Sequence, residues 1–234
     1  MILEQQLHNK LPIPGKTNFD WYLFHKMASD YAGKPMCEVG VGDGGSSLTL
    51  ADLTNNLDLI DSWHQTWVKE PVQEYFDKLN HPARFIDAKS IEVTAKQLQK
   101  YSVVHLDANK AYIQVYDDLC FYSEHCKGII CVDDYLQSMW PEVTRAVDDF
   151  VHRTNWNRLL IGNHQVFLSK KKETSALQDI IMNFPVVIRH KEVYFTYGDL
   201  PNDKLFQKFM KCQNNKEYTW HRTAYTRINK ANED

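Results

Sequence analysis

A glycine-rich loop places the strongest constraint on the fold of this chain. The stretch EVGVGDGGSS, residues 38–47, holds four glycines within six positions, and Gly40, Gly42 and Gly45 have the spacing G-x-G-x-x-G. Such loops bind a nucleotide when they join a buried strand to a helix, because backbone N–H groups and the helix N-terminus converge on the ligand. The apolar run MCEV before the loop and the amphipathic run SSLTLADLTNN after it meet that condition. The loop therefore predicts an α/β sheet with a ligand site at one edge.

Short apolar runs alternate with longer amphipathic stretches along most of the chain. Strands are expected at 36–41, 57–61, 83–87, 102–107 and 128–134, and helices at 17–33, 46–56, 72–80, 90–100, 111–126 and 141–154. Ser90 is expected to cap the helix 90–100. The stretch NRLLIGNHQVFLSKK reads as two strands around Gly162-Asn163, an antiparallel hairpin. Five β–α units and a hairpin predict a doubly wound, mostly parallel seven-stranded sheet closed by an antiparallel edge strand.

Domain organisation is expected to change near residue 172. Residues 1–172 are predicted to form one α/β domain, with a lid segment over about 1–35. The remainder, 173–234, is predicted to be an extension that packs on or near the same domain. It contains strand-like VVIRHKEVYFTYGD and helix-like NDKLFQKFMKCQ, and we expect it to shape an acceptor pocket or a homodimer contact.

Composition excludes several classes of protein. A net charge of −3 over 234 residues gives no electrostatic reason to expect a nucleic-acid partner. No apolar run approaches the roughly 18 residues that a membrane span needs, and the N-terminal stretch lacks the apolar core of a secretion signal. The five cysteines form no C-x-x-C pair and fit buried thiols in a reducing compartment. We therefore predict a cytoplasmic protein that acts on a small molecule.

Charge in and near the loop bears on the choice of cofactor. Asp61 ends the next strand, 19 residues after Gly42, where a carboxylate can accept both hydroxyls of an adenosine ribose. NAD and S-adenosylmethionine (SAM) sites share this feature. Asp43 inside the loop would repel a pyrophosphate, whereas Glu38 and Asp43 together suit the cationic sulfonium and ammonium of SAM. A tight turn without any ligand is the alternative.

Acidic residues also end the fourth and fifth strands. Asp107 follows VVHL, with Lys110 three residues later, and Asp133 and Asp134 follow IICV. The carboxyl ends of neighbouring parallel strands open onto the same crevice, and three carboxylates gathered there repel one another unless a cation joins them. Mg²⁺ or Mn²⁺ prefers such oxygen ligands. An NAD dehydrogenase needs no such cluster, so the acidic cluster favours SAM as the cofactor. The alternative is that these acids are solvated strand ends without a ligand.

These segments resemble the class I SAM-dependent methyltransferases, in particular the small cation-dependent O-methyltransferases. That group includes catechol and caffeoyl-CoA enzymes and sugar enzymes of macrolide biosynthesis. The resemblance covers about residues 15–170. CEVGVGDGGSS looks like the family's first motif, LIDSW like the end of its second strand, and RFIDAKSIEVTAKQL like the segment that flanks adenine. LDANKAY is similar to the caffeoyl-CoA branch and VDDYLQSMWPEVTRAVDDF to the sugar branch.

The resemblance implies a set of site residues. Cofactor contacts are expected from Glu38, Gly40, Gly42, Gly44, Ser46, Asp61, Ser62, Asp87, Ala88 and Ser90, and metal ligands from Asp107, Asp133 and Asp134. Lys110 is expected to take the proton from a metal-bound hydroxyl, which then attacks the methyl group of SAM. The segment Lys16, Thr17 and Asn18 is expected near the site.

Several points stay open at this stage. Asn109 stands where the sugar branch carries an acid, and Asp134 stands where the catechol branch carries asparagine. The chain therefore departs from both branches, and the expected acceptor is either a sugar or a phenolic hydroxyl. His105 is the second candidate base, because strand alternation places it on the same face as Asp107. Asp118 is expected on a solvated helix face. An NAD oxidoreductase and a non-catalytic or hydroxylase-like SAM-binding relative are the competing functions.

Overall fold

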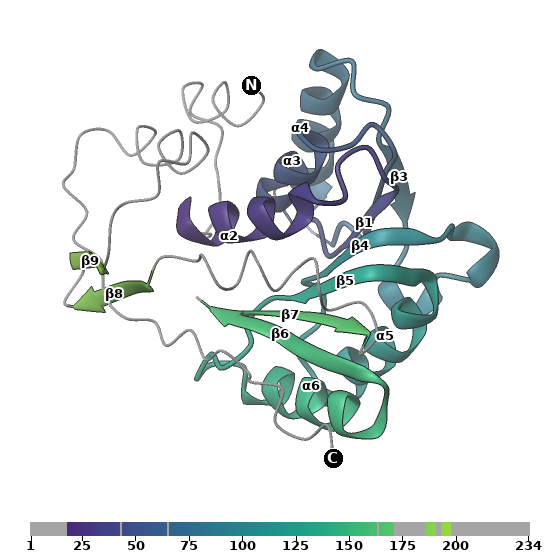
Figure 1. Cartoon of the computed structure of the whole chain (residues 1–234). Coiled ribbons are helices and arrows are strands. Elements are labelled where there is room, and N and C mark those ends of the chain that lie inside the picture. Colours follow the sequence, from purple (N-terminus) through teal and green to yellow (C-terminus); the bar gives the residue numbers. More distant parts are fainter. Residues whose placement is uncertain are drawn as a thin grey trace.

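The computed structural model describes residues 18–42, 44–64, 66–162, 164–170, 186–190 and 193–197. Figure 1 shows one large sheet with helices on both faces. The helices are α2 (Asn18–Ser29), α3 (Gly45–Ala51), α4 (Thr66–Lys78), α5 (Tyr112–His125) and α6 (Pro141–Arg153). The strands of the large sheet are β1 (Met36–Val39), β2 (Leu57–Asp61), β3 (Arg84–Asp87), β4 (Tyr101–Leu106), β5 (Cys126–Val132), β6 (Trp156–Gly162) and β7 (Gln165–Lys170). A separate hairpin joins β8 (Val186–His190) to β9 (Val193–Tyr197).

The seven strands lie in the order β3-β2-β1-β4-β5-β7-β6. Strands β1 to β5 pair in parallel, whereas β7 is antiparallel to both β5 and β6. The predicted doubly wound sheet is therefore confirmed, with the antiparallel strand one position in from the edge. Chain order reverses between β1 and β4, so the carboxyl ends of these strands border the crevice where open α/β sheets bind ligands.

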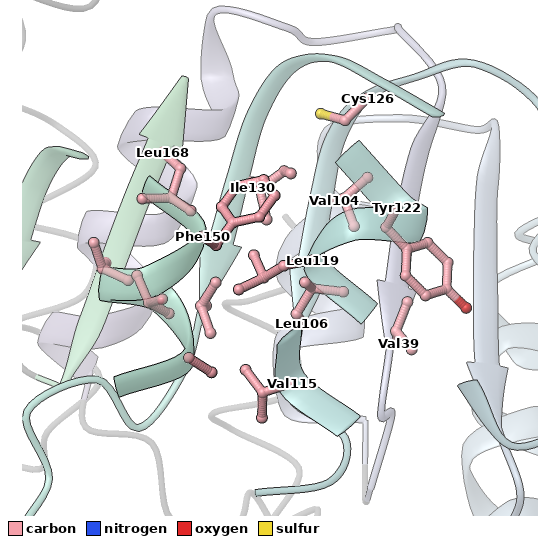
Figure 2. Close-up of a cluster of buried hydrophobic side chains, with 14 of the residues drawn as sticks. Val39, Val104, Leu106, Val115, Leu119, Tyr122, Cys126, Ile130, Phe150 and Leu168 are labelled. Atoms are coloured by element: carbon pink, nitrogen blue, oxygen red, sulfur yellow. The ribbon is translucent and has the colours of Figure 1, made fainter. Parts of the chain in front are cut away.

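Two apolar layers hold the helices against the sheet. On one face, Leu119 of α5 and Phe150 of α6 pack on Val104, Leu106 and Ile130 (Figure 2). The opposite face is covered by α2, α3 and α4 through a second cluster, which includes Phe24, Met27, Leu48, Phe76, Val103, Ile129 and Phe167. Because side chains alternate along each strand, every strand contributes apolar residues to both faces of the sheet. Burial of these residues fixes the register of the strands, and so the positions of the acidic residues at their ends.

The side chain of Phe24 on α2 is fully buried in this second cluster. Lys16 and Thr17 lie outside the described residues, and of Asn18 only its place at the start of α2 is described. The predicted strands at 186–199 are confirmed as β8 and β9. The predicted helix at 202–213 lies outside the described part of the chain. Within that part, no helix combines the length and the hydropathy that a bilayer span requires.

The predicted helix at 90–100 is wrong. Two short 3-10 turns, Ser90–Glu92 and Ala95–Gln97, occupy this segment, and Lys89 rather than Ser90 is the N-cap of the first. Between the turns Val93 adopts an extended backbone, with φ −70° and ψ 133°, and its side chain is buried in the core. Burial of this β-branched residue outweighs the helical pattern of its neighbours.

Candidate active site

A cavity of about 330 Å³ opens at the carboxyl ends of β1, β2 and β4. This volume is within the range of pockets that hold a small cofactor. Six of the ten predicted cofactor residues line it, namely Gly40, Gly42, Asp61, Ser62, Ala88 and Ser90. Asp107 lines it as well, so the cavity reaches the first of the predicted metal ligands. His64, Lys89, Asn109 and Gln114 also line it.

Glycine is required at position 40 because the loop passes against the end of β4. Gly40 has φ +87°, and a Cβ atom there would lie 2.3 Å from the backbone oxygen of Asp107. No L side chain fits this approach, which joins the loop to the strand that carries the acid. Gly44 also has a left-handed φ, +83°, as the N-cap of α3. Asp43, on which the charge argument partly rests, lies outside the described residues.

Asp61 accepts hydrogen bonds from the backbone of the glycine loop. Its Oδ2 accepts from the N–H groups of Val41 at 2.8 Å and Gly42 at 3.1 Å, and its Oδ1 accepts from that of Trp63 at 2.6 Å. The carboxylate therefore holds the loop in shape and also lines the cavity. The predicted role as ribose acceptor stays a prediction, and the geometry adds a structural role that the sequence did not suggest.

Glu38 lies behind the loop rather than in the cavity lining. Its side chain is fully buried and accepts hydrogen bonds from the hydroxyls of Ser46 and Ser47 at the start of α3. His105 Nδ1 lies 3.1 Å from Glu38 Oε1. The structure thus gives Glu38 and Ser46 internal partners, and Gly44 also lies outside the lining.

The segment after β3 contributes unevenly to the cavity. Ala88 and Ser90 line it, whereas the half-exposed Asp87 pairs with Lys69 at 2.6 Å and does not. The hydroxyl of Ser90 hydrogen-bonds Asp118 of α5. Asp118 is only 5% exposed, so its predicted place on a solvated helix face is wrong. Burial raises the pKa of this carboxyl to about 7, against a smaller opposing effect of the Ser90 hydrogen bond.

The carboxyl ends of β4 and β5 bring candidate metal ligands together. One imidazole nitrogen of His105 and one carboxylate oxygen each of Asp107 and Asp133 lie within 4.8 Å of one another. The third predicted ligand, Asp134, instead lies 2.6 Å from Lys110 Nζ. Two of the three predicted aspartates are therefore adjacent, together with a histidine that was predicted only as a candidate base.

Lys110 forms ion pairs with both Asp107 and Asp134. Burial favours the neutral amine, but the two carboxylates outweigh it and raise the pKa of Lys110 above its ordinary value. In this arrangement the side chain is an ammonium. Its predicted role as a base requires Nζ to separate from at least one of these aspartates.

Gln165 is a polar residue at the same edge that sequence reasoning missed. Its side chain is fully buried at the start of β7. Val166 pairs with Val132, so Gln165 lies beside the position of Asp133. The one available signal was a polar residue opening the apolar run VFL after the hairpin turn.

Neither a protein-family model nor a curated protein matches this chain, but solved structures do. The O-methyltransferase TomG from Streptomyces achromogenes, solved in complex with SAM, is 16% identical, with 71% of this chain and 86% of its own covered and a TM-score of 0.54. An O-methyltransferase from Bacillus cereus, solved with SAH, is 10% identical, with 73% and 89% covered and a TM-score of 0.56. An rRNA methylase from Streptococcus thermophilus is 12% identical, with 67% and 98% covered and a TM-score of 0.52.

These likenesses cover 67–73% of this chain. At identities of 10–16% they establish the fold. The chain has the Rossmann-like fold of the class I SAM-dependent methyltransferases, which confirms the fold that the sequence motifs implied.

Proposed function

We propose that this protein is a SAM-dependent O-methyltransferase that acts on a hydroxyl of a small molecule with the help of a divalent cation. One observation carries the proposal. Asp107 lines the cavity beside the glycine loop and also belongs to the cluster with His105 and Asp133. A methyl donor in the cavity and a hydroxyl at the cluster would therefore meet at a single residue.

The hydrogen bonds of the loop argue against the NAD alternative. In a dinucleotide site the backbone N–H groups of the glycine loop face the pyrophosphate. Here the N–H groups of Val41 and Gly42 donate to Asp61. The Asp61 carboxylate thus accepts hydrogen bonds from the N–H groups that a phosphate would need, and it places a negative charge beside them. SAM has no phosphate and carries positive charge, so it suits this loop better.

The residues at the ends of β4 and β5 fit a divalent cation by their chemistry. Asp107 and Asp133 offer hard oxygen ligands, and the fully buried Gln165 brings an amide without a hydrogen-bond partner in the described part of the chain. A divalent cation, when bound there, lowers the pKa of an acceptor hydroxyl. Asp107 and Asp133 would orient that hydroxyl, and Lys110 Nζ is the candidate proton acceptor once it leaves its aspartate partners.

Apolar side chains near the ends of the same strands support an acceptor with an aromatic part. Leu136, Met139 and Trp140 lie between β5 and α6, and Ile113 lies in the first turn of α5. All four are exposed, from 39% for Trp140 to 72% for Met139. A phenolic ring would cover such surface better than a sugar, so we place phenols first among the acceptors.

Methyl transfer itself tests the proposal. The protein would be incubated with SAM and Mg²⁺ or Mn²⁺ against phenols, catechols and sugars, and SAH release would be measured. We expect SAH release with at least one hydroxyl acceptor and its loss in excess chelator. SAM binding without SAH release across the panel would favour the non-catalytic relative, and full activity in chelator would remove the cation from the mechanism.

A further inference from the structure

We propose that the cation of this site is bound by His105 together with Asp107 and Asp133, and that this mixed ligand set selects a first-row transition-metal ion over Mg²⁺. The catalytic role of the cation rests on the proposed function, but the inference itself concerns metal binding alone. It replaces one ligand of the sequence-based set, Asp134, by a histidine.

The positions of the two aspartates of β5 differ. Asp133 has a carboxylate oxygen within 4.8 Å of ligand atoms of His105 and Asp107. Asp134 adopts a left-handed backbone, with φ 62°, and its carboxylate pairs with Lys110 at 2.6 Å. Lys110 pairs with Asp107 as well, so the ion pair alone does not separate Asp134 from Asp107. Asp107 has a carboxylate oxygen within the cluster of His105 and Asp133, and the histidine, rather than Asp134, takes the third position.

His105 is held as metal-binding histidines usually are. A ligating imidazole commonly donates its other ring N–H to a carboxylate, which fixes the tautomer and the ring orientation. His105 Nδ1 lies 3.1 Å from Glu38 Oε1, and Glu38 is itself held by the hydroxyls of Ser46 and Ser47. A proton on Nδ1 leaves Nε2 as the nitrogen for a metal. Phe24 also packs on the imidazole, with ring centroids 4.7 Å apart.

The buried side-chain amide of Gln165 is independent evidence that a polar ligand binds beside the cluster. Strand registers pair His105 with Cys131 and Cys131 with Phe167, so these three side chains share one face of the sheet. Gln165 precedes Phe167 by two residues and therefore lies on that same face, at the end nearest Asp133. Its side chain is fully buried, and within the described ranges neither its Oε1 nor its Nε2 has a hydrogen-bond partner. A buried amide is rarely left so unless a ligand completes it.

The ligand chemistry decides the class of cation. Mg²⁺ favours sites made of oxygen and retains several waters, whereas imidazole suits first-row transition metals. One imidazole with two carboxylates, and an amide oxygen beside them, therefore favours a first-row transition-metal ion over Mg²⁺. We expect Mn²⁺ to bind at least about ten-fold more tightly than Mg²⁺.

Mn²⁺ alone is the probe that tests this ligand set. Chelator-treated full-length protein, without SAM or acceptor, would be titrated with Mn²⁺, and free Mn²⁺ would be followed by electron paramagnetic resonance. Pulsed measurements on the bound ion detect coupling to a directly ligating imidazole nitrogen. We expect that coupling in the wild-type protein, which needs no variant and therefore does not depend on whether a variant folds.

Three variants make the test sharper. His105→Gln keeps a donor toward Glu38, and we expect it to abolish the nitrogen coupling and weaken Mn²⁺ binding by about 10–100-fold. Asp134→Asn is expected to keep the coupling and bind Mn²⁺ within about three-fold of wild type. His152→Gln, at an exposed position on α6, is the matched histidine control and is expected to change neither quantity.

Bound Mn²⁺ without nitrogen coupling, lost in Asp134→Asn, would establish the three-aspartate set and overturn this proposal. Absence of Mn²⁺ binding at millimolar concentration would overturn it as well. SAM binding and SAH release are measured separately on the same protein. Their failure counts against the proposed function, and the metal result stands regardless.

Discussion

At the scale of single residues, one carboxylate has two structural consequences. Asp61 accepts hydrogen bonds from two backbone N–H groups of the glycine loop and from that of Trp63, and it also faces the cavity. Its spacing from the loop could be recognised in the sequence, because the ends of adjacent parallel strands meet at one edge. Its hydrogen bonds could not be, since they depend on how the loop folds back over β2.

Replacing this carboxylate should affect both the loop and the ligand. Asp61→Asn turns one acceptor oxygen into an NH₂ group that faces backbone donors, so we expect SAM affinity to fall by about 1.5–3 kcal/mol and the melting temperature to fall with it. Calorimetry and thermal unfolding measure the two effects. Asp77→Asn, at an exposed position on α4 outside the cavity lining, is the matched control and should change SAM affinity little. Equal SAM affinity in wild type and Asp61→Asn would contradict the assignment.

Lys110 is predicted to matter for turnover rather than for cofactor binding. If Nζ takes the proton of the acceptor, Lys110→Ala should lower kcat by about 10²–10⁴ while SAM still binds. Lys110→Arg should not restore activity, because a guanidinium stays protonated. The measurement is kcat against pH with one phenolic acceptor for wild type and Lys110→Ala. Superimposable profiles would exclude the lysine as the base.

At the scale of elements, strands were predicted more reliably than the segments that join them. Each strand of the parallel sheet is a short apolar run with its own local signature, whereas the segment 90–100 looked helical and forms two 3-10 turns. The burial of Val93 and the pairing of Ser90 with Asp118 decide its shape. Both depend on contacts with α5 and the core, which no local pattern contains.

The buried carboxyl of Asp118 should make stability depend on pH. Burial raises its pKa from 3.8 to about 7, so the folded state binds this proton more tightly than the unfolded state. This contribution to stability is full below about pH 4 and is lost as the pH rises toward 7. Asp118→Asn removes the ionisable carboxyl and with it this loss of stability at higher pH, so the variant should gain about 1–3 kcal/mol relative to wild type between pH 5 and pH 8.

Urea unfolding of both proteins at several pH values measures this difference. Asp77→Asn, at an exposed position on α4, is the control and should show the wild-type dependence. A difference between wild type and Asp118→Asn that does not vary with pH would contradict the raised pKa.

The loop between β1 and α3 should tolerate no side chain at position 40. Gly40 and Gly33 both have positive φ, +87° and +75°, but only Gly40 has backbone atoms within reach of a new Cβ. Gly33→Ala should therefore cost about 1–2 kcal/mol of unfolding free energy from conformation alone. Gly40→Ala should cost about 1–3 kcal/mol more, because the loop must move away from β4. Urea unfolding compares the two, and equal losses would show that the close approach to Asp107 is unimportant.

At the scale of the whole molecule, the sheet order explains why the sequence predicted part of the site. β1, β2, β4 and β5 end at one edge, so residues that follow them meet there, as Gly40, Asp61 and Asp107 do. The rest depends on tertiary geometry. The turn of Asp134 toward Lys110 follows from a left-handed backbone, and the place of Gln165 follows from the antiparallel register of β7. Neither leaves a signature in a local stretch of sequence.

In the proposed function, the cavity beside the glycine loop binds SAM and not a dinucleotide. Isothermal titration of the wild-type protein with SAM, and separately with NAD⁺, tests it most directly. We expect saturable binding of one SAM per chain, weakened in Asp61→Asn, and no heat of binding from NAD⁺. Binding of NAD⁺ in the absence of SAM binding would contradict it.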